Sequence, residues 1–161
     1  SHEDSQGNKG RTTAGNVQVM SAGTGIIHSE HNYEDEETNI YQIWIIPKSK
    51  GIAPKWGSAE FPTESSKDKL KLLVSGDDDA PLQINQDARI YTGTFNDHTT
   101  LKHQIKGQGY LLVSKGYIKI GDIEAVKGDG IAIINEKEVS LDCHPDTEII
   151  LIEVPGLVEA R

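Results

Sequence analysis

The residues of this sequence best suited to chemistry are His28 and Glu30, an imidazole and a carboxylate two positions apart. If residues 26–30 form a β-strand, both side chains point to the same face, because side chains alternate along a strand with a period of two. Together they offer two ligands to a borderline metal such as iron, nickel, copper or zinc. A lone His-x-Glu is more often a surface ion pair, and two ligands bind a metal weakly.

The elements that must position this pair are predicted to be β-strands. Short runs of β-branched and aromatic residues recur along the chain, and glycine, asparagine or aspartate turns separate them. No helical period extends over three turns, and only residues 65–69 suggest short helical turns. Strands so short and closely spaced are typical of a β-sandwich or barrel. The predicted strands are residues 17–20, 40–46, 110–113, 117–120, 131–134, 139–141 and 148–154.

Two β units are predicted, with a linker between them. Residues 48–69 are rich in proline, glycine, serine and lysine, a composition typical of linkers. We therefore expect one unit over residues 1–47, a second over 70–156 and a loose tail over 157–161. The first unit has too few predicted strands to close a sandwich, so we expect upstream sequence, another chain or the second unit to complete it.

Composition narrows the range of partners. The chain has 161 residues, a net charge of -9 and a pI of about 5.1, which argues against electrostatic binding to nucleic acid or an anionic membrane. No apolar run approaches the ~18 residues needed to cross a bilayer. The single cysteine, Cys143, rules out an internal disulfide and fits a reducing cytoplasm, where we place the protein. The only methionine is Met20, so we interpret the chain as a trimmed product.

The stretch around His28 resembles the second conserved motif of the cupin superfamily, G-x5-P-x-G-x2-H-x3-N. Gly15 and five further residues precede Ser21-Ala22-Gly23, with serine where the motif has proline, and His28 and Asn32 keep the H-x3-N spacing. The spacer before His28 is two residues longer than in the general motif.

That longer spacer is normal in the pirin signature, which residues 18–30 resemble more specifically. Residues 2–8 and 41–45 look pirin-like as well. The resemblance implies an all-β bicupin, in which two cupin barrels (double-stranded β-helices, or jelly rolls) follow one another. It implies one divalent metal in the N-terminal barrel, iron by expectation, with nickel, copper, manganese or zinc as alternatives.

In pirins the metal ligands are three histidines and a glutamate, and two of them match His28 and Glu30. The other two histidines belong to an upstream H-P-H-like motif that is not found in this sequence, and His2 lies on the strand after it. We therefore expect an incomplete N-terminal barrel, lacking its N-terminal part, that carries half of the family's metal site.

For the intact chain, with the two upstream histidines present, the resemblance further implies quercetin 2,3-dioxygenase chemistry, in which O2 opens the central ring of a flavonol and carbon monoxide leaves. Glu30 would also take the hydroxyl proton as a catalytic base, and His28 would be a neutral ligand. Apolar residues would form the pocket wall. The alternative is a redox-sensing module without enzymatic activity that binds a basic protein partner or forms a homodimer; a third reading is an inactive fragment. The residues named as pocket wall are Met20, Ile26, Ile27 and Trp44.

The remaining histidines are weaker candidates. His2 is expected to be disordered at the chain start, and His31 to be exposed. His98 and His103 could contribute to a second site, but no carboxylate lies at the cupin spacing. His144 is not expected to pair with its neighbour Cys143, because adjacent strand residues point to opposite faces. Residues 128–135 occupy the place of the second cupin motif without its histidine, so we expect the C-terminal barrel to be metal-free.

Overall fold

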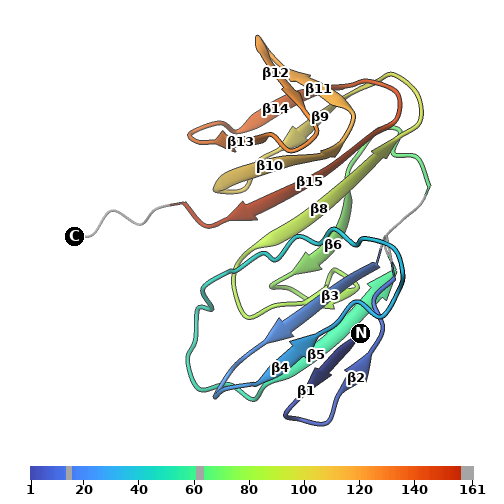
Figure 1. Cartoon of the computed structure of the whole chain (residues 1–161). Helices are drawn as coiled ribbons and strands as arrows, with labels where there is room; N and C mark the ends of the chain where they lie inside the picture. The colour runs from blue at the N-terminus through green and yellow to red at the C-terminus, as the bar shows by residue number, and fades with distance from the viewer. Residues whose placement is uncertain (14–15, 61–63, 157–161) are drawn as a thin grey trace.

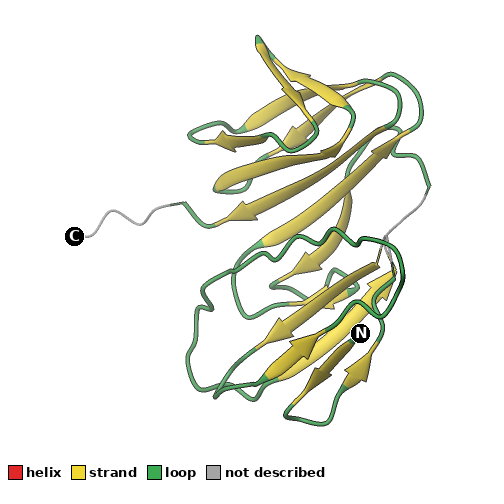
Figure 2. Ribbon diagram, in the orientation of Figure 1, coloured by secondary structure: helices red, strands yellow, loops and turns green. Residues whose placement is uncertain are grey.

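The computed structural model describes residues 1–13, 16–60 and 64–156, and within these ranges the regular structure is entirely β-strand (Figure 2). The predicted all-β class is therefore confirmed. No helix long and apolar enough to cross a membrane occurs in the described ranges.

The C-terminal half is a sandwich of two antiparallel sheets, seen in the upper part of Figure 1. Its larger sheet has the order β13-β10-β15-β8-β6-β7, in which only the β6–β7 pair is parallel. The smaller sheet has the order β12-β11-β14-β9. The larger sheet contains β6 (Lys71–Ser75), β7 (Leu82–Gln83), β8 (Arg89–Phe95), β10 (Gln108–Lys115), β13 (Gly130–Ile133) and β15 (Thr147–Val154). The smaller contains β9 (Thr99–Gln104), β11 (Tyr117–Ile120), β12 (Ile123–Val126) and β14 (Glu138–Cys143).

The main core lies between these two sheets. Along β15 every second side chain is buried, as expected for a strand with one face against a core. Both sheets contribute fully buried side chains to one cluster, among them Phe95, Leu111, Ile118, Leu141, Ile149 and Leu151. The turn between β10 and β11 needs Gly116, because its φ is +81° and an added Cβ would lie 2.4 Å from Thr147 Oγ1.

The N-terminal half forms two small sheets, which lie in the lower part of Figure 1. One has the order β2-β1-β4, and the other pairs β3 with β5. A second apolar cluster joins the halves, because Leu73, Val74 and Leu82 of the larger sheet pack against Val17, Val19 and Ala59. The strands are β1 (His2–Asp4), β2 (Lys9–Gly10), β3 (Asn16–Ser21), β4 (His28–Glu30) and β5 (Lys55–Glu60).

Two predictions about local structure are wrong. Residues 40–46 form no strand, since no neighbouring strand of the described chain receives their hydrogen bonds, and most of their side chains are exposed. Residues 65–69 contain bends but no helical turn. The segment predicted as a linker, residues 48–69, also contains β5, which pairs with β3 over six residues. The division into units at 1–47 and 70–156 stays a prediction, and the tail at 157–161 lies outside the described residues.

Cys143 lies on β14 with its side chain fully buried. Burial, and secondarily the charge of Asp142, raise the pKa of its thiol to about 12. At pH 8 only about one thiol in ten thousand would be ionised, and the thiolate is the reactive form. We expect Ellman's reagent to leave the folded chain unmodified over hours and to modify one thiol at once after unfolding in guanidinium chloride. Rapid modification of the folded chain would contradict this burial.

Candidate metal centre

The structure places His28 and Glu30 on β4, which pairs with β1 so that Glu30 lies opposite His2 and His28 opposite Asp4. Both side chains lie beside the His2 ring. The His28 ring stacks on it with centroids 5.6 Å apart, and Glu30 Oε1 is 3.7 Å from His2 Nδ1. The predicted pair thus lies on one side of a short strand, around a histidine.

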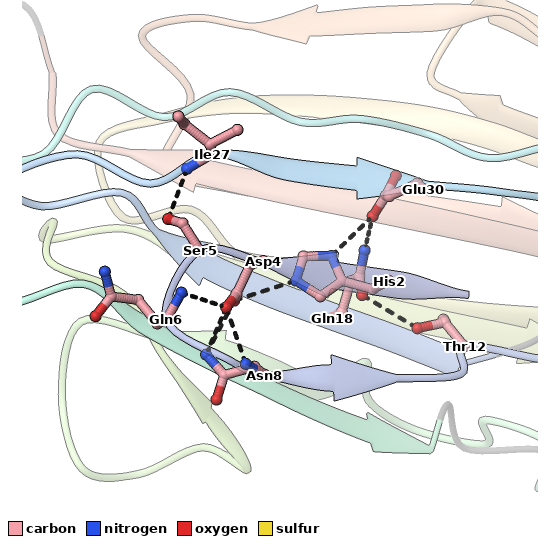
Figure 3. Close-up of polar contacts among 9 residues, drawn as sticks. All are labelled: His2, Asp4, Ser5, Gln6, Asn8, Thr12, Gln18, Ile27 and Glu30. Carbon is pink, nitrogen blue, oxygen red and sulfur yellow. Dashed lines mark hydrogen bonds and ion pairs between the residues drawn. The ribbon is translucent and has the colours of Figure 1, made fainter.

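The carboxylate of Glu30 is held by two glutamine side chains. Gln18 Nε2, on β3, donates to Oε1, and Gln42 Nε2 donates to Oε2 at 3.4 Å. Thr12 in turn donates its hydroxyl to the Gln18 side-chain oxygen at 3.2 Å, as the chain of dashed lines in Figure 3 shows. Glu30 is half-buried and His28 is exposed, so the pair is open to solvent on the His28 side.

His2, which we expected to be disordered, is buried at the centre of this group. Its ring is stacked between His28 and Trp56, whose ring centroid is 5.4 Å away. Gly10 makes room for Trp56, since a Cβ there would lie 2.6 Å from the indole. The signal was present in the sequence: His2 and Asp4 have the same i, i+2 spacing as His28 and Glu30, and so share one face of β1.

Asp4 orients the His2 ring. Its carboxylate lies 3.3 Å from His2 Nε2 and also accepts hydrogen bonds from the backbone amides of Gln6 and Asn8 and from the Asn8 side chain. Burial opposes ionisation of Asp4, but the hydrogen bonds from Asn8, His2 and Gln6 outweigh it and lower the pKa of the carboxyl to about 2. In the tautomer that donates its Nε2–H to Asp4, the other ring nitrogen, Nδ1, carries a lone pair and faces Glu30.

That His2 Nδ1 is buried and has no hydrogen-bond partner. A buried nitrogen without a partner costs free energy unless something else binds it. A histidine that gives one ring N–H to a carboxylate and points its other nitrogen into a site has the arrangement usual for metal-ligating histidines. The donor types of His28, Glu30 and His2 suit a borderline divalent metal. In the described chain, however, their ligand atoms do not converge closely enough for all three to hold one ion without side-chain movement.

The other predicted site residues lie elsewhere. His31 is exposed as expected and stacks on Tyr33. A cleft of about 410 Å³ opens beside His2, but neither His28 nor Glu30 lines it. Ile27 and Trp44 are 80% and 91% exposed in this chain, so the pocket wall expected of the intact chain stays a prediction.

His103 is part of a pair that the sequence did not reveal. Its Nε2 lies 2.9 Å from Glu153 Oε1 in the C-terminal sandwich, where Glu153 is almost fully buried and His103 is half-buried. The ring of Tyr91 packs edge-on against His103 with centroids 4.7 Å apart. Glu153 lies fifty positions from His103 in the sequence, and its buried position in the alternation of β15 was the only available signal.

Each half of the chain matches the model of a known protein family. Residues 1–45 match the family model of pirin, and residues 72–154 match that of the quercetinase C-terminal cupin domain. This chain belongs to the pirin family. The predicted resemblance and the cupin fold are thereby confirmed.

Pirin-family relatives match almost the whole chain. A pirin-like protein of Caulobacter vibrioides is 42% identical over 94% of this chain and 67% of its own length. The quercetin 2,3-dioxygenase of Escherichia coli is 37% identical over 96% and 67%. The chain therefore spans about two thirds of the length of the curated relatives that it matches.

Solved pirin structures have the same fold. The crystal structure of YhhW from Escherichia coli superposes with a TM-score of 0.88 at 35% identity, covering 99% of this chain and 68% of YhhW. A second structure shows the bacterial pirin YhhW in complex with nickel(II), with a TM-score of 0.86, covering 97% and 68%. This chain therefore corresponds to about two thirds of YhhW and has the same fold over that part.

Proposed function

We propose that this pirin-family chain contributes to a metal-dependent quercetin 2,3-dioxygenase, with His28 and Glu30 as ligands of the metal. The observation that carries the proposal is that both side chains lie against His2. The Glu30 carboxylate is 3.7 Å from the buried Nδ1 atom of His2, which has no hydrogen-bond partner, and the His28 ring stacks on the same imidazole. Relatives named quercetin 2,3-dioxygenase support the reaction type. We retain iron as the expected metal, and the nickel complex of YhhW supports nickel as the first alternative.

A bound divalent metal would lower the pKa of a flavonol hydroxyl and hold the substrate for reaction with O2. Glu30 would accept the proton of that hydroxyl, with its carboxylate held in place by Gln18 and Gln42. His28 would bind as a neutral imidazole, and its exposure leaves the substrate side open. His2, fixed by Asp4, would keep the His28 ring in position by stacking.

The test is turnover by the metal-loaded chain. We expect the protein that combines this chain with the two upstream histidines, loaded with Fe²⁺ or Ni²⁺, to consume flavonol and O2 in equal amounts and to release carbon monoxide in the same amount. Glu30→Gln keeps the shape of the side chain but removes the base, so it is expected to reduce turnover at least about a hundredfold. His31→Gln, at an exposed histidine, is the control. Metal binding without turnover would contradict the enzyme proposal.

The alternative is a redox-sensing module that binds another protein. The exposed apolar side chains of residues 40–46 favour it, since Trp44 and Ile46 are 91% and 84% exposed and a contiguous apolar surface usually has a partner. The iron-loaded protein separates the two proposals. A sensor would bind iron and leave flavonol unchanged, and its affinity for the partner would change with the oxidation state of the iron. A cytoplasmic location stays a prediction from the single cysteine.

A further inference from the structure

A second group of metal-type ligands lies on the outer face of the C-terminal sandwich. His98 precedes β9, Asp142 lies near the end of β14, and His144 directly follows β14. These strands pair with Cys143 opposite Thr99, so continuing the register by one residue brings His144 opposite His98. Leu141 and Cys143 are buried, and the alternation of the strand therefore turns Asp142 and His144 outward together.

The three side chains converge at this point. His98 Nε2 lies 2.6 Å from Asp142 Oδ1, and the His98 and His144 rings meet edge to face with centroids 5.3 Å apart. One ligand atom from each residue lies within 4.8 Å of the others. Ligand atoms around a four-coordinate metal with bonds of about 2.1 Å lie roughly 3.4 Å apart, so small side-chain rotations would bring all three into range.

His144 is held in place by Tyr117. Its ring packs perpendicular to that of Tyr117 with centroids 4.5 Å apart, and its backbone amide donates to the Tyr117 carbonyl at 3.1 Å. An ion pair between His98 and Asp142 would not need His144 at all. The placement of a second, braced imidazole beside that pair is what distinguishes a ligand set from a simple surface ion pair.

We propose that His98, Asp142 and His144 bind a divalent transition-metal ion, Zn²⁺ or Ni²⁺ by donor type, at a site separate from the pirin centre. Two imidazoles and a carboxylate suit these ions, and three protein ligands leave a coordination position open. Cys143 takes no part because its sulfur points into the core. The site would join β9 to β14 on the outside of a barrel whose interior we expect to be metal-free.

The test is a titration of the isotope-labelled chain with Ni²⁺, a paramagnetic ion that broadens the amide signals near its binding site. We expect selective broadening around His98, Asp142 and His144, and Zn²⁺ should compete with it. His98→Ala and Asp142→Asn each remove one ligand from an exposed position and should weaken binding there by at least about tenfold. His31→Ala, at an exposed histidine outside the group, is the matched control.

Signals around β4 report on the pirin centre in the same spectra, so the two sites are scored independently. The proposal is overturned if Ni²⁺ in large molar excess leaves the β9–β14 signals sharp. It is also overturned if the broadening there is unchanged in both variants. Retained signal dispersion in the variants shows that lost binding is not lost folding.

Discussion

Replacing His28 and Glu30 together by alanine is expected to abolish metal binding at the pirin centre. The double substitution removes the imidazole and the carboxylate that flank His2, and leaves its unpartnered Nδ1 as the remaining donor of the group. A single nitrogen holds a borderline metal far too weakly to retain it. Anaerobic titration calorimetry with Fe²⁺ or Ni²⁺ measures the effect directly.

The titration is best done in a chain that already carries His98→Ala and Asp142→Asn, so that the second proposed site does not contribute heat. His31→Ala with Glu37→Ala removes the same two side-chain types from exposed positions, three residues after His28 and seven after Glu30, and serves as the control. Equal binding by the parent chain and the His28/Glu30 variant, or no binding by either, would show that these residues are not the ligands in this chain.

Replacing Phe95 by alanine is expected to lower the free energy of unfolding by about 3–5 kcal/mol. Phe95 is fully buried in the core between the two C-terminal sheets, where Gly93 gives its ring space. The substitution loses the transfer free energy of the ring and leaves a cavity that the β-sheets on either side cannot fill by collapsing. Urea denaturation followed by fluorescence gives the change.

Ile123→Ala is the matched control for this core substitution. Its side chain is 53% exposed on β12, so the free energy of unfolding should change by less than about 0.5 kcal/mol. If Phe95→Ala were as mild as Ile123→Ala, the two C-terminal sheets would not share the tightly packed core that the structure shows.

The sequence predicted the strands whose apolar and polar residues alternate locally. It failed where strand formation depends on a partner that is distant in the sequence. Tyr117–Ile120 and Thr147–Val154 were found because a strand facing a core leaves a period of two in its residues. Residues 40–46 have an equally strong apolar pattern, but a strand needs a neighbour to bond with, and composition does not specify one.

The same distinction applies to the candidate sites: residues close in the sequence were predicted, and residues brought together by strand pairing were not. His28 and Glu30 were found because their spacing and the surrounding motif are contiguous in the sequence. Their neighbours Gln18 and Trp56 were missed as parts of the site, because only the pairing of β1, β3, β4 and β5 brings them together. The group of His98 with Asp142 depends on the register of β14 against β9, over a separation of 44 residues.

The small apolar cluster of Leu73, Val74 and Leu82 with Val17, Val19 and Ala59 makes the two halves thermodynamically dependent on each other. Separating the halves would expose this apolar surface to water. The free energy needed to unfold either half locally therefore includes the cost of exposing the apolar surface of the other. A ligand that binds only the folded N-terminal half therefore also protects the larger sheet from local opening. Occupancy of the pirin centre would be transmitted to β6 and β7 as slower opening, without any change in their shape.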